Sequence, residues 1–258
     1  MTVLIVDVGN TRIKWARLDG ERLARGRAAM HSRWRAADYA RLFGARTPER
    51  VVAASVAGAR VNRALVAAAR RAGAAVRFLS TPRRGGGVTV GYAQPWRLGV
   101  DRFAAAVGAH ALFPSVPVCV VGVGTALTVD LVGAEGRHRG GLIVPAPQLM
   151  VATLLAQTHG IRRRARGGAT GGKGLFARST RDAIERGAHY AAAALIDRAV
   201  EEASVRVARQ PLVVLTGGGA PALAALLRSS AVGVPDLVLR GLAVLARAPA
   251  SRQASRAR

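Results

Sequence analysis

Lysine is almost absent from this chain, although the chain is strongly basic. Lys14 and Lys173 are the only lysines among 39 basic residues, so arginine supplies nearly all of the formal net charge of +25. Aromatic residues make up 4% of the sequence, and the arginines are scattered along it. A nucleic-acid-binding protein more often gathers basic and aromatic side chains on one surface. The composition therefore argues against specific nucleic-acid recognition, although polyanions should bind non-specifically at low salt.

Cysteine and long apolar segments are also scarce. Cys119 is the single cysteine and cannot form a disulfide within the chain, which is typical of a reducing compartment. No run approaches the roughly 18 uninterrupted apolar residues of a membrane span, and the first strand carries a charge at Asp7. Half of the 258 residues are hydrophobic, enough for one domain or two halves with a sizeable core. We expect a globular, cytoplasmic protein without a membrane partner.

Acidic residues are few, which makes the position of each one informative. Of the 14 carboxylates, Asp7, Asp101 and Asp130 lie among apolar or glycine residues, where a carboxylate costs free energy unless it has partners. These three are therefore the candidates for chemistry. The sequence lacks a P-loop, a Rossmann glycine pattern after the first strand, a nucleophile elbow and metal-ligand spacing of Cys and His.

The first 18 residues predict a hairpin whose tip suits an anion. An apolar strand carrying Asp7 breaks at Gly9-Asn10-Thr11 and resumes as a strand with two unlike faces. Such a turn leaves backbone N–H groups pointing one way, as phosphate binding requires. Asp7 could hold a metal ion or a water beside the anion, and Lys14 could supply positive charge. The alternative is an ordinary hairpin with a solvated carboxylate.

The second half of the chain repeats this pattern. An apolar strand from residue 117 breaks at Gly124-Thr125, and the strand that follows carries Asp130. A third strand is expected in each half, over residues 22–29 and 136–144. Two such units predict a duplicated α/β fold with two mixed sheets and a cleft between the halves. Two unrelated hairpins are the alternative.

A third glycine-rich turn, Gly217-Gly218-Gly219, follows the strand predicted over residues 211–216. Glycine at a strand exit permits close approach of the backbone to a ligand and an amide cradle for phosphate. One such turn is weak evidence, because glycines end many strands. Three of them, together with two paired hairpins, favour a nucleotide-binding protein.

Asp101 lies at the predicted start of a helix, in Gly99-Val100-Asp101-Arg102. A carboxylate there could accept a proton from a substrate hydroxyl in a kinase-type transfer, and the alternative is a helix cap. Phosphoryl transfer otherwise needs positioning and positive charge, so Asp7 and Asp130 could hold Mg²⁺ while the turn amides and Lys14 hold phosphate.

Together these motifs resemble those of type III pantothenate kinases, close relatives of the Bvg accessory factor proteins in the superfamily of acetate and sugar kinases, Hsp70 and actin. Residues 7–14 resemble the first phosphate motif, residues 99–102 the pantothenate motif, and residues 124–130 the second phosphate motif. Residues 140–145 and the stretch ending at Gly187 also match. The resemblance spans nearly the whole chain. It implies a duplicated actin/ribonuclease H-like fold with halves at residues 1–114 and 115–248. The basic composition of residues 249–258 predicts a disordered tail.

The resemblance also implies roles for individual residues. Asp101 would accept the hydroxyl proton while pantothenate is phosphorylated by ATP, the first step of coenzyme A synthesis. The expected pantothenate contacts are Tyr92, Gly99, Val100, Asp101, Arg102 and Thr180. The expected ATP contacts are Asp7, Val8, Gly9, Asn10, Thr11, Arg12, Ile13, Lys14 and Thr125, with Gly217 and Gly218 added from the third turn. The resemblance further implies Mg²⁺, a monovalent cation (K⁺ or NH₄⁺) and a homodimer with pantothenate near the subunit interface.

Two departures from the family pattern bear on these expectations. The family usually has Asp two residues before the second Gly-Thr turn, where it holds the monovalent cation, and this chain has Gly122. The cation requirement is therefore in doubt. Ala146 follows Pro145 where the family usually has glycine. Two other functions stay open: a Bvg accessory factor-like regulatory protein that has lost catalysis, and another small-molecule kinase of the superfamily.

Overall fold

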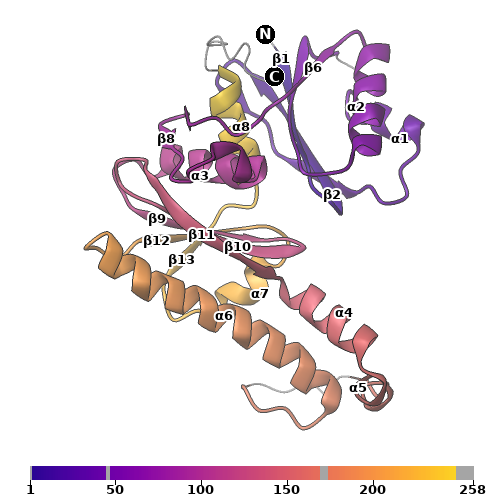
Figure 1. Cartoon of the computed structure of the whole chain (residues 1–258). Coiled ribbons are helices and arrows are strands. Elements are labelled where there is room, and N and C mark those ends of the chain that lie inside the picture. Colours follow the sequence, from indigo (N-terminus) through magenta and orange to yellow (C-terminus); the bar gives the residue numbers. More distant parts are fainter. Residues whose placement is uncertain (1, 45–46, 169–173, 248–258) are drawn as a thin grey trace. The chain divides into compact units, whose positions relative to one another are not determined.

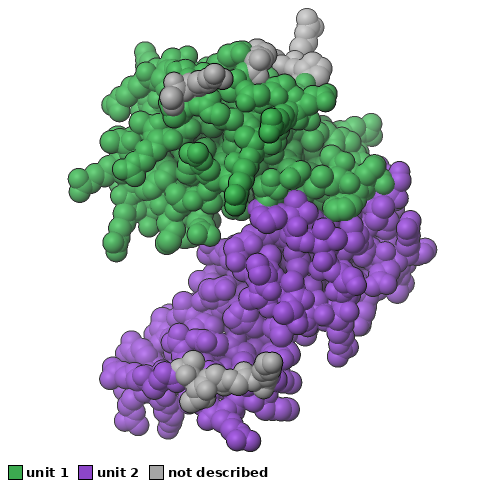
Figure 2. Space-filling view, turned by 180° about the vertical axis from the view of Figure 1, so that it is seen from behind, with its two compact units in different colours: residues 1–114, 236–258 green, residues 115–235 purple. Residues whose placement is uncertain are grey.

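The computed structural model of the chain describes residues 2–44, 47–168 and 174–247. The chain divides into two compact units, residues 1–114 with 236–258 and residues 115–235 (Figure 2). The helix α8 (Leu237–Arg247) belongs to the first unit because its buried apolar face packs against α3 (Val100–Leu112). This corrects the prediction that the second half extends to residue 248. The predicted tail, residues 249–258, lies outside the described residues.

The first unit is built on a mixed sheet. Its strands are β1 (Thr2–Val8), β2 (Arg12–Asp19), β3 (Arg22–Leu23), β4 (Arg27–Met30), β5 (Arg50–Ser55) and β6 (Ala75–Phe78). They lie in the order β3-β2-β1-β5-β6, with β4 also pairing with β2. β1 is antiparallel to β2 and parallel to β5, and β5 is parallel to β6. The opening hairpin is therefore the centre of this sheet.

The predicted third strand over residues 22–29 is interrupted. Leu18 pairs with Leu23 and Trp15 pairs with Arg27, so three residues, 24–26, lie opposite two residues of β2. An extra residue of this kind breaks the ladder as a bulge does. The edge of the sheet is consequently made of two short strands.

Helices cover this sheet because its strands alternate apolar side chains between two faces. On one face, Leu4, Val6 and Val8 form a core with α2 (Ala59–Arg71) and the region of α1 (Ala36–Ala40). The helices α3 and α8 lie side by side in the same unit (Figure 1). A Cβ atom at Gly241 would overlap the Ala104 carbonyl, so glycine permits this close helix contact. A small ladder of β7 (Arg84–Gly85) and β8 (Val88–Thr89) and the 3-10 turn Pro95–Arg97 precede α3.

The second unit repeats the topology of the first. Its strands are β9 (Val118–Val123), β10 (Ala126–Val132), β11 (His138–Pro145), β12 (Leu212–Thr216) and β13 (Ala231–Gly233). Their order is β11-β10-β9-β12-β13, with β9 antiparallel to β10 and parallel to β12, and β12 parallel to β13. Strand for strand, β9, β10, β12 and β13 correspond to β1, β2, β5 and β6. The predicted duplicated α/β fold with two mixed sheets is confirmed.

The helices of the second unit are α4 (Pro147–Gln157), α5 (His159–Arg164), α6 (Thr180–Arg206) and α7 (Ala220–Ala224). Ile196 and Val200 on α6 are buried in a core with Val121 and Leu127 of the sheet. Ser179 caps α6 by accepting a hydrogen bond from the Asp182 N–H, so Thr180 is the first helical residue rather than the cap. Among the helices of the described ranges, none is long and apolar enough to cross a membrane.

Candidate active site

Asp7 lies near the end of β1, opposite Lys14 on β2. Its side chain is almost fully buried, and the Lys14 Nζ atom is 3.9 Å from Asp7 Oδ2. Burial raises the pKa of Asp7 to about 6; the positive charge of Lys14 opposes this rise, and the negative charge of Asp101 adds to it. Asp7 and Asp101 are thus close enough to interact electrostatically, although 94 residues separate them in the sequence.

The turn between β1 and β2 is closed by one backbone hydrogen bond, in which the Gly9 N–H donates to the Arg12 carbonyl at 3.0 Å. Asn10, Thr11 and Arg12 are exposed at its tip. The buried ring of His31 holds this turn from behind, with Nε2 2.7 Å from the Gly9 carbonyl oxygen. His31 was absent from the sequence predictions, because a lone histidine after a broken strand carries no recognisable signal.

Asp101 lies in the first turn of α3, and Gly99 is the N-cap residue of that helix. A Cβ atom added to Gly99 would be 2.6 Å from Asp101 Oδ1, so the carboxylate folds back over the glycine. Glycine therefore leaves the space that this carboxylate occupies. Asp101 is the second residue of α3, so it is not itself the N-cap residue.

Arg102 and Tyr92 are brought together in the same unit. Arg102 is 8% exposed, and its Nη1 atom donates to the Tyr92 hydroxyl at 3.3 Å. Arg83 holds the backbone of the Tyr92 loop by donating to the carbonyls of Tyr92 and Ala93, both at 2.6 Å. Sequence reasoning missed Arg83, since one arginine among many in this chain gives no signal. The predicted pantothenate contacts Tyr92 and Arg102 thus lie together in the first unit, and Arg83 holds the loop that carries Tyr92.

The remaining predicted nucleotide contacts belong to the second unit. Thr125 and Gly124 form the exposed tip of the β9–β10 turn, closed by the Gly124 N–H donating to Ala126 at 3.0 Å. Gly217 has a φ of +99°, and a Cβ atom there would overlap the Val123 carbonyl. The Gly219 N–H donates to the same carbonyl at 3.2 Å. The second and third glycine turns therefore meet at the end of β9.

Asp130 differs from the other two candidate carboxylates. It lies on β10 and is 2% exposed, and its Oδ1 atom is 2.8 Å from Nε2 of the fully buried His138. Burial, and secondarily the charge of Asp130, raises the pKa of Cys119 to about 12. The geometry favours a structural role for Asp130 in the core of the second unit.

The residues fit a magnesium ion that arrives with ATP better than one held by protein alone. No group of three or more His, Cys, Asp or Glu side chains suited to a metal ion occurs within the described part of the chain. Mg²⁺ in kinases is commonly bound by one or two carboxylates together with substrate phosphates. Asp7, with Asp101 nearby, provides such carboxylates.

The position expected to hold a monovalent cation does not fit one. Gly122 supplies no carboxylate, and a Cβ atom there would be 2.8 Å from Thr128 Oγ1. Thr128 is the direct cross-strand partner of Gly122. A longer side chain at residue 122 would therefore require Thr128 to move.

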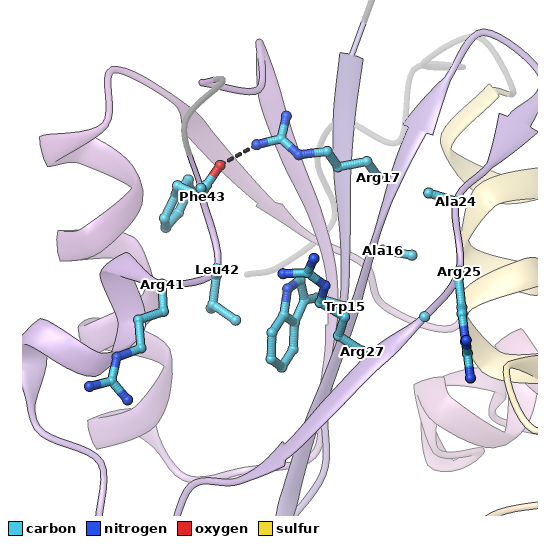
Figure 3. Close-up of a pocket in the computed structure, with 11 residues that line it drawn as sticks. Trp15, Ala16, Arg17, Ala24, Arg25, Arg27, Arg41, Leu42 and Phe43 are labelled. Carbon is cyan, nitrogen blue, oxygen red and sulfur yellow. Dashed lines mark hydrogen bonds between the residues drawn. The ribbon is translucent and has the colours of Figure 1, made fainter.

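The first unit also contains a cavity of about 740 Å³ at the edge of its sheet (Figure 3). Four arginines line it together with Trp15 and Phe43, and the Arg17 guanidinium donates to the Phe43 carbonyl. None of the predicted site residues lines this cavity. Three successive residues of β2, Trp15, Ala16 and Arg17, line it, whereas Asp7 and Lys14 do not.

Comparison with known proteins identifies the family. A family model described as type III pantothenate kinase matches residues 3–202. The chain belongs to the type III pantothenate kinase family. Type III pantothenate kinases from Azoarcus sp. (strain BH72) and Alkalilimnicola ehrlichii are 40% and 41% identical to it, covering 96% and 95% of this chain and 92% and 97% of their own lengths.

Solved structures support the fold of this pantothenate kinase family member. A Campylobacter jejuni protein assigned to the Baf family of transcriptional activators aligns with a TM-score of 0.57 at 18% identity, covering 93% of this chain and 94% of its own. The ADPNP-bound activator of 2-hydroxyisocaproyl-CoA dehydratase from Clostridium difficile aligns with a TM-score of 0.53 at 16% identity, covering 95% and 94%. These likenesses show a shared duplicated fold.

Proposed function

We propose that this protein transfers the γ-phosphoryl group of ATP to the hydroxyl of pantothenate, giving 4'-phosphopantothenate and ADP in the first step of coenzyme A synthesis. The proposal is carried by a group of residues in the first unit of this member of the type III pantothenate kinase family. The group comprises an exposed turn with its backbone amides, Asp7 beside Lys14, and Asp101 close to Asp7. The near full-length relatives share the activity by name.

The proposed chemistry assigns one role to each group. The pantothenate hydroxyl oxygen attacks the γ-phosphorus, the bond from that phosphorus to the bridging oxygen of ADP breaks, and Asp101 accepts the hydroxyl proton. The turn amides and Lys14 bind phosphate oxygens and so stabilise the charge of the transferring group. Tyr92 and Arg102, with Gly99 and Val100, are proposed to orient pantothenate.

The other nucleotide and substrate contacts remain predictions for the second unit. Thr125, Gly217 and Gly218 are proposed to contact ATP, and Thr180 to contact pantothenate. Their support is the meeting of two glycine turns at the end of β9 and the position of Thr180 in the first turn of α6.

Metal ions enter the proposal in two different ways. Asp7 is proposed to hold Mg²⁺, which when bound would neutralise charge on the ATP phosphates. Asp130 was predicted to share this ion, but its hydrogen bond to buried His138 supports that role less well. A requirement for K⁺ or NH₄⁺ is not proposed, because Gly122 supplies no carboxylate ligand.

We also propose that the protein acts as a cytoplasmic homodimer. Large apolar side chains are exposed in the second unit: Ile143 on β11, Leu149 and Leu154 on α4, and Phe176 before α6, the last 90% exposed. Exposed apolar residues that gather in one patch mark protein interfaces, and a dimer would bury such side chains. Light scattering of the purified chain would show a dimer; a monomer at micromolar concentration would contradict this part of the proposal.

The activity is tested by following ADP release with pantothenate in a coupled assay containing Mg²⁺ and ATP, with and without K⁺. Pantothenate-dependent turnover is expected, and its absence under both conditions would overturn the proposal. A panel of sugars, sugar acids and acetate tests the other kinases of the superfamily. Faster turnover of any of these than of pantothenate would favour that alternative. The retention of Asp7 and Asp101 gives no support to a regulator that has lost catalysis.

A further inference from the structure

We infer that His31 is a positioning residue that orients the backbone amides of the Gly9–Arg12 turn toward a phosphate group. The inference rests on the proposal that this turn binds ATP phosphates. His31 directly follows β4, and its side chain is 6% exposed. It holds the turn twice: its ring Nε2 is 2.7 Å from the Gly9 oxygen, and its backbone N–H donates to the Thr11 oxygen at 3.2 Å.

These two contacts fix alternate peptide planes. A carbonyl oxygen can only accept a hydrogen bond, so the His31 Nε2 atom carries the proton and donates it to Gly9. In a trans peptide the C=O and the next N–H point in opposite directions, and no cis peptide occurs in the described residues. Holding the Gly9 and Thr11 carbonyls therefore aims the N–H groups of Asn10 and Arg12 away from His31. Both residues are exposed.

Glycine makes this restraint necessary. The Gly9–Asn10 peptide rotates through ψ of Gly9 and φ of Asn10, and the cost is small because glycine has no Cβ atom and asparagine tolerates positive φ. A rotation would turn the Asn10 N–H away from the phosphate. A hydrogen bond from a buried side chain resists the rotation, since the unmade bond would leave the buried donor unsatisfied.

The corresponding turn of the second unit has the backbone contact but lacks a contact like that of the His31 ring. Ala126 begins β10 and pairs with Pro145, as Arg12 begins β2 and pairs with Met30. The residue after Pro145 is Ala146, whose N–H donates to Thr125 at 3.2 Å, matching the His31 backbone contact. Ala146 is buried but has no side chain that could reach Gly124. The ring of His31 is therefore an addition found at the first, and not at the second, of the two hairpin turns that we propose contact ATP.

The test compares ATP, which has phosphates, with adenosine, which has none. Calorimetry on the full chain with Mg²⁺ would measure both affinities for the wild type, His31→Ala, His31→Asn and His31→Gln. Alanine copies the second unit, asparagine is polar but too short to reach Gly9, and glutamine can still donate. His110→Ala is the matched control, because His110 lies on α3 in the same unit and its ring faces Gly87.

We expect His31→Ala and His31→Asn to weaken ATP binding roughly five- to tenfold, the effect of one lost hydrogen bond, with adenosine affinity unchanged. Glutamine should recover part of the loss, and His110→Ala should change neither affinity. Equal losses for ATP and adenosine, or no loss for ATP, would overturn the inference, as would a wild type that does not bind ATP. A wild type that binds ATP but does not phosphorylate pantothenate would refute the proposed function alone. If His31→Ala does not fold, His31→Asn and His31→Gln still decide.

Discussion

The two hairpins of this protein have one topology but differ in what surrounds their turns. Val8 pairs with Ile13 in the first, enclosing residues 9–12, whereas Val123 pairs with Leu127 in the second, enclosing residues 124–126. The first turn is thus one residue longer. A longer loop presents more backbone N–H groups to a ligand but is less restrained by its own ladder, and the His31 ring supplies a restraint there.

The carboxylates of the two hairpins, Asp7 and Asp130, also differ in their surroundings. Asp7 lies two residues before the first turn, with the Lys14 Nζ atom 3.9 Å from its carboxylate and a pKa raised to about 6. The corresponding position of the second hairpin is Gly122, and the carboxylate of that hairpin, Asp130, lies deeper in the sheet against His138. A duplicated fold therefore does not imply duplicated chemistry. One hairpin has a carboxylate with a raised pKa close to its turn, and the other has its carboxylate hydrogen-bonded to a buried histidine.

The largest expected effect is that of replacing Asp101, the proposed general base. Asp101→Asn keeps the size of the side chain but cannot accept the hydroxyl proton, so kcat should fall about 10²- to 10⁴-fold. Steady-state kinetics with saturating ATP and pantothenate would measure this, and calorimetry should find ATP binding nearly unchanged. An unaltered kcat would remove Asp101 from the catalytic role.

A second prediction concerns the effect of the buried Asp7 carboxylate on the free energy of unfolding. The pKa of Asp7 rises from 3.8 to about 6 on folding, so between these values the folded state holds a proton that the unfolded state has lost. The free energy of unfolding should therefore fall as pH rises through this window and remain lower above it. Asp7→Asn removes this cost and should stabilise the protein at pH 8 by on the order of 3 kcal/mol.

Urea unfolding of Asp7→Asn without nucleotide or Mg²⁺ would measure this gain at pH 8. The gain should vanish near pH 3.5, where Asp7 is largely protonated in both states. A variant that is less stable than the wild type at pH 8 would contradict the burial argument. Turnover should be impaired in the same variant, because the proposed Mg²⁺ ligand is lost.

The same substitution in the second hairpin is expected to act with the opposite sign. Asp130→Asn weakens a buried hydrogen bond to His138, so the protein should lose about 2 kcal/mol of stability. The Mg²⁺ concentration that gives half-maximal turnover should not change. A raised Mg²⁺ requirement without a loss of stability would instead support Asp130 as a metal ligand.

The smallest expected effect concerns the monovalent cation. Because residue 122 is glycine, replacing K⁺ and NH₄⁺ by a bulky organic cation at constant ionic strength should leave turnover essentially unchanged. Turnover assays in potassium and tetramethylammonium buffers would measure this. Loss of activity in the organic buffer would show that oxygen ligands other than a residue 122 carboxylate bind the ion.

The sequence by itself determined the fold class, the duplicated hairpins and the family. These depend on local signals, since alternation of apolar side chains predicts strands and glycines mark the turns that join them. Asp7 and Asp101 could be selected because a carboxylate in an apolar or glycine-rich stretch is unusual. The motif spacing around them then supplied the resemblance to type III pantothenate kinases.

Tertiary structure alone decided the partners of these residues. The approach of Asp101 to Asp7, the contact of His31 with Gly9 and the place of α8 in the first unit join segments 22 or more residues apart. Such contacts arise from packing of whole elements, on which local periodicity carries no information. The pKa of Asp7 likewise depends on how completely the folded chain excludes water from one carboxylate.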